Sequence, residues 1–333
     1  MTPRSFAYRN PIYSPAWEAL RDPQILRVGG AYYMTGSQPP YWGEGPNPGV
    51  RLWRSDDLLS WEVAADLVRR DDMPDDAWCR DRFWSPEIHA RGGRFYLTFT
   101  ARNEARQTGW GQGLAVSERI EGPYRLVTRD APLRWGGIDL SLFTDEDGRS
   151  YGYHSGAGGI VAAEIDLDRG AYASGPVPCV QMIPGTWEDR VMEGPFVIRR
   201  RGRYYLFYSC GARGYEVGYA VADRPLGPWT KAPGNPLFGV QNAESCRKMG
   251  IAFTGDPDCR LLFAGHNAVF PGPDGGDWVC YLVQEKGRRE TLAIDPIRVE
   301  KGLLRTPAPT WTPQKVSLGE AWRERPAGEK ARE

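Results

Sequence analysis

The sequence predicts an all-β fold, a five-bladed β-propeller with four antiparallel strands in each blade. The chain of 333 residues contains 40 Gly, 28 Pro, 13 Trp and 16 Tyr, and it shows few long helical patterns. This composition is typical of short strands joined by turns. A turn-and-strand pattern also recurs five times along the chain, at the period expected of propeller blades.

Each of the five repeats begins with a turn and continues as an aromatic or apolar strand. In order they are "GGAYYMTGS" (29–37), "GGRFYLTFT" (92–100), "DGRSYGYHS" (147–155), "RGRYYLFYS" (201–209) and "DCRLLFAGH" (258–266). With Tyr33, Tyr96, Tyr151, Tyr205 and Leu262 taken as equivalent, the spacings are 63, 55, 54 and 57 residues. A short apolar strand precedes each copy, "IAFTG" (251–255) in the fifth, and a third strand with an outer segment follows. Four strands per repeat are therefore expected.

We expect residues 1–316 to form one propeller domain and the polar, charged residues 317–333 to form a C-terminal tail. Lys+Arg and Asp+Glu both number 42, which argues against a nucleic acid or an anionic membrane as the main partner. The first residues lack the apolar run of a signal peptide, and no later run could span a bilayer, so a cytoplasmic location is expected.

Three features of the sequence are interpreted as structural. The six cysteines are scattered without a CxxC motif, which favours free thiols over disulfides or a zinc site. A basic run, which contains Arg199, Arg200, Arg201 and Arg203, falls at a predicted strand-to-strand turn and is interpreted as a solvated hairpin tip. The stretch "YEVGYA" (215–220) is interpreted as an inward strand without a binding role.

Three carboxylates fall at a similar position of the repeat, at the start of the first strand. Asp22 precedes its anchor tyrosine by 11 residues, and Asp139 and Glu193 precede theirs by 12. The second repeat has Trp84 and Ser85 there, with Glu87 slightly later, and the fifth has Gly250.

First strands line the axis of a propeller, so we expect the three carboxylates to surround one depression. Carboxylates held close together raise one another's pKa. One carboxyl group that acts as an acid and another that acts as a base are what glycoside hydrolysis requires. Alternatively, each Asp or Glu caps a turn, since Asp-Pro and Glu-Gly-Pro are ordinary turn sequences.

These motifs resemble glycoside hydrolase family 43, a family of five-bladed propellers. The resemblance extends over nearly the whole chain through "RDPQILRVGGAYYMTGS", "FWSPEIHARGGRFYLTFTA", "GIDLSLFTDEDGRSYGYHSG", "MEGPFVIRRRGRYYLFYS" and "GHNAVF". It implies that Asp22 is the general base, that Glu193 is the general acid, and that Asp139 raises the pKa of the acid and orients it. It also implies inversion at the anomeric carbon, for which acid and base stand roughly 6.5–9.5 Å apart.

The resemblance suggests further roles around these acids. Trp84 resembles the aromatic residue that shapes the sugar subsite, Phe83 is expected to flank it, and packing in a blade is the alternative for Trp84. His266 resembles an axial histidine that lies next to a water or a metal ion. No cofactor is required, although a calcium ion near the axis is one expectation. The "SPEI" motif departs from the family pattern, which leaves Glu87 as a secondary candidate.

The resemblance implies an inverting exo-glycosidase that acts on terminal α-L-arabinofuranosyl or β-D-xylosyl residues of oligosaccharides. A sugar-binding propeller without catalysis, and a related propeller enzyme with another sugar or a retaining mechanism, are the alternatives. Specificity is assigned to the loops 37–49, 69–83 and 101–111, whose shapes the sequence does not fix.

Overall fold

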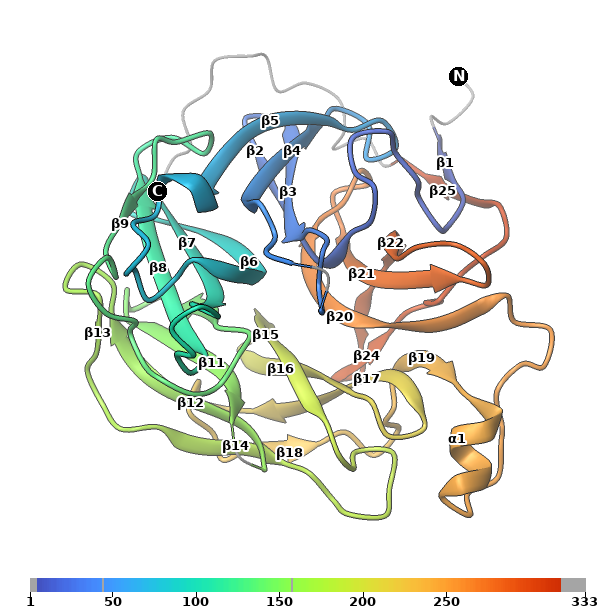
Figure 1. Ribbon diagram of the computed structural model, residues 1–333. Coiled ribbons are helices and arrows are strands. Elements are labelled where there is room, and N and C mark those ends of the chain that lie inside the picture. Colours follow the sequence, from blue (N-terminus) through green and yellow to red (C-terminus); the bar gives the residue numbers. More distant parts are fainter. Residues whose placement is uncertain (1–4, 44, 157, 319–333) are drawn as a thin grey trace.

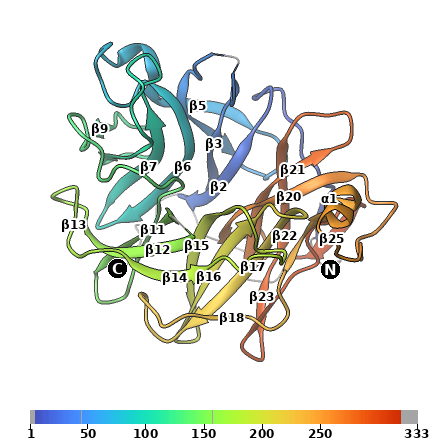
Figure 2. The same cartoon turned by 60° about the horizontal axis from the view of Figure 1, so that its bottom comes forward.

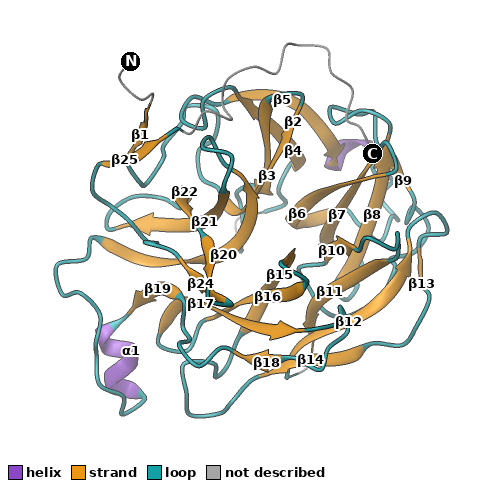
Figure 3. Cartoon of the chain, turned by 180° about the vertical axis from the view of Figure 1, so that it is seen from behind, coloured by secondary structure: helices purple, strands orange, loops and turns teal. Residues whose placement is uncertain are grey.

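The computed structural model describes residues 5–43, 45–156 and 158–318, and it confirms the five-bladed propeller. Figure 1 shows five antiparallel sheets arranged around a central axis. The first strands of neighbouring blades contact one another, which places them innermost. Figure 3 shows how little of the chain is helical, with α1 (Ala243–Lys248) at the outer edge and η1 (Arg70–Asp72) in a loop.

The first two blades each contain four strands in sequential order from the axis outward. Blade one consists of β2 (Arg21–Val28), β3 (Ala31–Ser37), β4 (Gly49–Ser55) and β5 (Glu62–Arg69). Blade two consists of β6 (Asp81–Arg91), β7 (Arg94–Arg102), β8 (Gly111–Ser117) and β9 (Arg125–Leu126).

The next two blades each have an additional strand on the outer side. Blade three consists of β10 (Ser141–Thr144), β11 (Ser150–Gly156), β12 (Gly159–Asp166), β13 (Ala171–Tyr172) and β14 (Val177–Gln181). Blade four consists of β15 (Met192–Arg200), β16 (Arg203–Cys210), β17 (Gly214–Ala222), β18 (Thr230–Lys231) and β19 (Phe238–Gln241). In both blades the last two strands pair with the same third strand, β12 or β17, so each sheet has a divided outer edge.

Blade five differs from its predicted register by one strand. Its sheet consists of β20 (Leu261–Pro271), β21 (Asp277–Glu285) and β22 (Thr291–Pro296). The stretch 258–266, expected to be the second strand, therefore belongs largely to the first, and 251–255 lies outside any strand. The cause is an insertion between blades four and five, which contains α1 and the loop up to β20 and breaks the regular spacing.

The N-terminal segment closes the ring at blade five. The backbone N–H of Ile12 donates to the carbonyl of Leu292 in β22 at 2.8 Å, and the side chain of Asn10 exchanges hydrogen bonds with the backbone of Ile294. Nearby, β1 (Ser5–Tyr8) pairs with β25 (Gln314–Ser317), and β23 (Arg298–Glu300) pairs with β24 (Leu303–Arg305). Figure 2 shows β25 and β23 beside the last blade. Ser317, expected to begin the tail, thus ends a strand, and 319–333 lie outside the described residues.

Buried aromatic side chains fill the spaces between blades. Trp53 of blade one, Tyr205 of blade four and Trp278 of blade five belong to one core cluster and are at most 1% exposed. Burying a large apolar side chain stabilises a fold by about 1.5–3 kcal/mol, so the inter-blade contacts hold the axial strands in place. All six cysteines are free. No helix in the described ranges is long and apolar enough to cross a membrane.

Candidate active site

A ring of five residues with left-handed backbone lies at one end of the axis. The residues, one from each blade, are Asp22, Ser85, Asp139, Gly194 and His266, with φ angles of 54°, 46°, 60°, 59° and 47°. In four of the blades the strand pairing shifts register at this point, as in a β-bulge. A bulge re-aims the side chain it carries and is common beside active sites. The blade-five equivalent of Asp22 is therefore His266 and not Gly250.

The same ring refines the position of Glu193. The backbone equivalent of Asp22 and Asp139 in blade four is Gly194, so Glu193 lies one residue earlier, paired with Ser209 of β16. A Cβ atom on Gly194 would lie 3.1 Å from the His266 ring, and its φ of 59° is strained for other residues. Glycine at this position lets the histidine approach the carboxylates closely.

A serine bridges the first two carboxylates. Ser85 Oγ donates to Asp139 Oδ1 at 2.6 Å and lies 3.3 Å from Asp22 Oδ2. Ser37 Oγ donates to the same oxygen of Asp22 at 2.5 Å and accepts the backbone N–H of Ser85 at 2.7 Å. Asp22 is thus held in one orientation, while its other oxygen faces His266.

Asp139 is the more deeply buried of the two aspartates, at 6% exposed. Its Oδ2 accepts the backbone N–H of Gly194 at 3.0 Å, and its own N–H donates to Thr100 Oγ1 at 2.9 Å. Burial raises the pKa of Asp139 and the charge of Asp22 adds to this, while His266 opposes it. The bond to Gly194 also joins this carboxylate to the backbone beside Glu193.

Glu193 has the electrostatic environment expected of a proton donor. Burial raises its pKa to about 7, and the charges of Asp139 and, less strongly, Asp22 add to the effect of burial. Tyr215 donates a hydrogen bond to Glu193 Oε1 at 2.9 Å, which acts in the opposite direction, as does His266. A carboxyl group with a pKa near 7 is substantially protonated at neutral pH.

His266 lies against the first aspartate. Its Nδ1 is 3.1 Å from Asp22 Oδ1, and its backbone N–H donates to Ser209 Oγ at 2.8 Å. Although burial opposes protonation, the surrounding carboxylates, Asp22 first among them, raise the pKa of His266. The imidazole of His266 is thus placed to hold the Asp22 side chain in position.

The donor set around His266 does not fit a calcium ion. Calcium takes six to eight oxygen ligands, and the described residues contain no group of three or more His, Cys, Asp or Glu arranged to hold a metal ion. Nδ1 of His266 is directed to Asp22.

The carboxylates open into a pocket of ≈ 530 Å³, within the usual range for small-ligand sites. Trp84 forms part of its wall and is 8% exposed. The centroid of its ring lies 4.4 Å from the ring centroid of Trp42 and 4.4 Å from that of Trp110. Trp42 also lines the pocket and is 62% exposed. Trp84 Nε1 has no hydrogen-bond acceptor within the part of the chain that the structure describes. With Trp42 exposed, this aromatic wall offers a flat apolar face to a sugar.

Phe83 does not line the pocket, contrary to expectation. Its side chain is fully buried and packs against Phe99 with ring centroids 5.6 Å apart. Neighbouring side chains of a strand point to opposite sides, so Trp84 faces the pocket and Phe83 the core. Glu87 is also buried outside the lining, with Oε2 3.0 Å from His89 Nε2.

Several pocket residues were not predicted from the sequence. Tyr215 is the first residue of a stretch interpreted as strand only, yet it contacts Glu193. Arg21 lies over the Tyr41 ring at 4.4 Å and forms an ion pair with Glu290 at 2.5 Å. The insertion before blade five contributes Asn242 and Ser245 to the lining, and the start of β20 contributes Leu262 and Phe263. Among these residues only Arg21 carries a sequence signal, because it directly precedes the Asp-Pro motif.

The fold and the pocket define a class of protein: five-bladed propellers that gather carboxylates from different blades at the axis, next to an aromatic wall. Residues 8–303 match Glycosyl hydrolases family 43, and the chain belongs to this family of glycoside hydrolases.

Relatives in this family carry several activities in their names. The chain is 30% identical to Xylosidase/arabinosidase 43B of Humicola insolens over 298 residues, which cover 85% of this chain but 50% of that protein. It is 27% identical to a β-D-galactofuranosidase of Aspergillus niger, covering 83% and 76% of the two chains. The crystal structure of a thermostable family-43 glycoside hydrolase is similar with a TM-score of 0.73 and 28% identity, covering 94% and 99%.

Proposed function

We propose that this protein is an inverting exo-glycosidase that removes terminal α-L-arabinofuranosyl or β-D-xylosyl residues from oligosaccharides. The observation that carries the proposal is the carboxyl group of Glu193, whose pKa is raised to about 7 in a pocket that it shares with Asp22 and Asp139. An acid that holds its proton and a separate carboxylate form the pair that hydrolysis with inversion uses.

In the proposed reaction Asp22 removes a proton from a water molecule, whose oxygen forms a bond to the anomeric carbon. The bond between that carbon and the leaving oxygen breaks, and Glu193 gives its proton to this oxygen. Asp139 raises the pKa of the acid through its charge and holds the backbone of Gly194. His266 and the two serines orient Asp22.

The pocket supports a small terminal sugar as the substrate. Its volume is ≈ 530 Å³, its aromatic wall can pack against a sugar ring, and Arg21 can donate hydrogen bonds to hydroxyl groups. The name of the Humicola relative favours arabinosyl or xylosyl residues. The name of the Aspergillus relative makes a galactofuranosyl residue the second candidate.

A panel of aryl glycosides tests this proposal, with the arabinofuranoside, xyloside and galactofuranoside compared by kcat/KM. The arabinofuranoside or the xyloside is expected to give the highest value. Proton NMR of the first-formed sugar is expected to show the anomer opposite to that of the substrate. Binding of sugars without turnover of any member would instead support a non-catalytic propeller, and retention of configuration would overturn the inverting mechanism.

The pH dependence of activity follows from the pKa of Glu193. Because the acid must be protonated, kcat/KM is expected to fall as the pH rises through about 7. Asp139→Asn removes the neighbouring charge, so the midpoint of this fall is expected to move to lower pH, although burial still keeps it above the ordinary value for Glu. Rates measured from pH 4 to 9 on both proteins check this.

A matched control is Asp223→Asn, an exposed aspartate at the other end of the blades that pairs with Arg203. Its pH profile is expected to equal that of the wild type. An unchanged midpoint in Asp139→Asn would contradict the electrostatic role of Asp139.

Tyr215→Phe is expected to shift the same midpoint to higher pH, because the hydroxyl group lowers the pKa of Glu193 by hydrogen bonding to Oε1. Because the Tyr215 hydroxyl group occupies Oε1 of Glu193, the transferable proton lies on Oε2. Without this hydrogen bond the proton is no longer confined to Oε2, so kcat for a substrate with a poor leaving group is expected to fall about ten-fold. Tyr13→Phe is the control, since Tyr13 is exposed, lies outside the pocket lining and bonds to Glu285. Equal losses at every pH in Tyr215→Phe would indicate a structural role only.

A further inference from the structure

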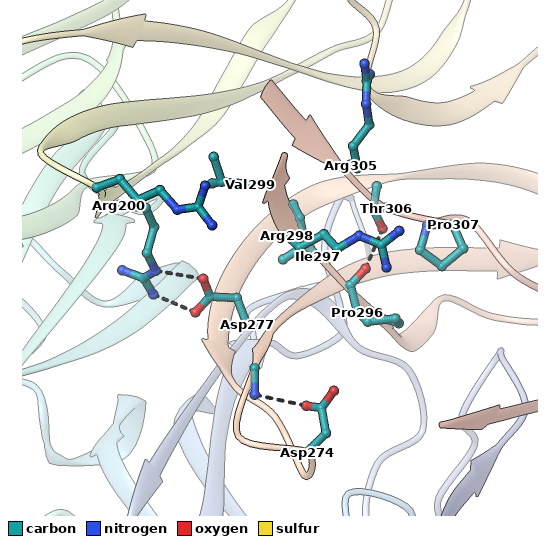
Figure 4. Close-up of a pocket in the computed structure, with 12 residues that line it drawn as sticks. Arg200, Asp274, Asp277, Pro296, Ile297, Arg298, Val299, Arg305, Thr306 and Pro307 are labelled. Carbon is teal, nitrogen blue, oxygen red and sulfur yellow. Dashed lines mark hydrogen bonds and ion pairs between the residues drawn. The ribbon is translucent and has the colours of Figure 1, made fainter. Parts of the chain in front are cut away.

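A second hollow, of ≈ 690 Å³, lies between blades four and five away from the carboxylates (Figure 4). Its lining consists of Arg200, Arg201, Asp274, Gly276, Asp277, Pro296, Ile297, Arg298, Val299, Arg305, Thr306 and Pro307. Strand β15 begins beside Glu193 and ends at Arg200, so the hollow is roughly 20 Å from the carboxylates, at the other end of the axial strands.

Four arginines from three separate segments line this hollow: Arg200, Arg201, Arg298 and Arg305. Arg200 is fixed by a two-pronged ion pair with Asp277, with Nε and Nη2 at 2.7 and 2.6 Å from the two carboxylate oxygens. Figure 4 shows this pair on one side and Arg298 on another. Arg298 pairs with Glu300 at 2.6 Å. In the described part of the chain, the side chains of Arg201 and Arg305 have neither a hydrogen-bond acceptor nor an ion-pair partner.

The backbone at Arg201 adds a second observation. The hairpins that end the first strands of blades one and two turn through Gly29–Gly30 and Gly92–Gly93, with positive φ at both residues. The corresponding hairpin of blade four turns through Arg201–Gly202, with φ of 53° and 77°. A non-glycine residue in this conformation costs about 1–2 kcal/mol, and glycine would avoid that cost. The turn thus presents a guanidinium group at the hollow where two equivalent turns present none.

The chemistry of the lining defines the ligand. Guanidinium groups bind carboxylate and phosphate oxygens through paired N–H donors. Pro296 and Pro307, which are at least partly exposed, provide an apolar surface against which the C–H face of a sugar ring can pack. We propose that this hollow binds a small carbohydrate that carries an anionic group, either a uronic acid or a sugar phosphate. The site is separate from the proposed catalytic function and does not depend on it.

Titration calorimetry with four probes tests the proposal: glucuronic acid, glucose 6-phosphate, neutral glucose and inorganic phosphate. Saturable binding of glucuronic acid or glucose 6-phosphate is expected, and the tighter of the two identifies the source of the anionic group. Arg201→Gly and Arg305→Ala are each expected to weaken binding about ten-fold. Arg201→Gly restores the glycine pair found in blades one and two, so its thermal stability is expected to equal or exceed that of the wild type.

Arg169→Ala is the matched control, because Arg169 is an 84% exposed arginine that does not line the hollow. It is expected to leave binding unchanged. No saturable binding of either anionic sugar would overturn the proposal. So would equal affinity for neutral glucose, equal affinity for inorganic phosphate, or binding that both arginine variants leave intact.

Discussion

Replacing Asp22 with asparagine is expected to lower kcat/KM by about 10²–10⁴-fold, the range for loss of a general base. Asparagine keeps the shape of the side chain and can still accept the hydrogen bonds of Ser37 and Ser85. It loses the negative charge that faces His266 and the capacity to take a proton from water. Loss of the base affects water attack, so the loss is expected to be similar for aryl glycosides with good and with poor leaving groups.

The measurement is steady-state kinetics of Asp22→Asn on two aryl glycosides that differ in the pKa of the phenol released. Asp66→Asn is the control, because Asp66 is a 40% exposed carboxylate in the same blade that pairs with Arg51. Thermal unfolding of both variants shows whether the fold is retained. Near-normal turnover by folded Asp22→Asn would rule out its assignment as the base.

The first four blades could be predicted from the sequence because their signals are local. A turn, an aromatic strand and a preceding apolar strand recur there at nearly constant spacing, and each hairpin is specified by residues close in sequence. The predicted register of the fifth blade is wrong by one strand because Leu262 lies in an apolar stretch of the first strand, β20, whose sequence resembles that of a second strand. The insertion that contains α1 lengthens the spacing between the second strands of blades four and five. The repeat spacing alone cannot show which of two apolar strands comes first in a blade.

The residues of the candidate site could be predicted where they occupy equivalent positions of the repeat. They could not be predicted where their role depends on the direction in which a side chain points. Asp22, Asp139 and Glu193 were found because equivalent positions in different blades meet at the axis. Ser85 and Tyr215 were not recognised as contacts, because their roles depend on where a bulge or a neighbouring strand directs a side chain. Such contacts join residues far apart in sequence, and no local pattern encodes them.

Glu193→Gln is expected to show a loss that depends on the leaving group. For an alkyl or sugar leaving group, whose oxygen needs a proton as the bond breaks, kcat/KM is expected to fall about 10²–10⁴-fold. For an activated aryl leaving group, which departs as a stable phenolate, little loss is expected. Glutamine keeps an acceptor for the Tyr215 hydroxyl group, so the pocket is expected to keep its shape.

Two further results distinguish the acid from a residue that only positions substrate. The decline of activity through about pH 7 is expected to disappear in Glu193→Gln, because the titrating group is gone. Glu146→Gln, an 83% exposed glutamate outside the pocket, is the control and is expected to keep both the rate and the pH profile. If the kcat/KM of Glu193→Gln fell by the same factor with every leaving group, Glu193 would not be the proton donor. Comparison of Glu193→Gln with Asp22→Asn tests the assignment further. Only Asp22→Asn, which lacks the base, is expected to lose activity whichever leaving group is released.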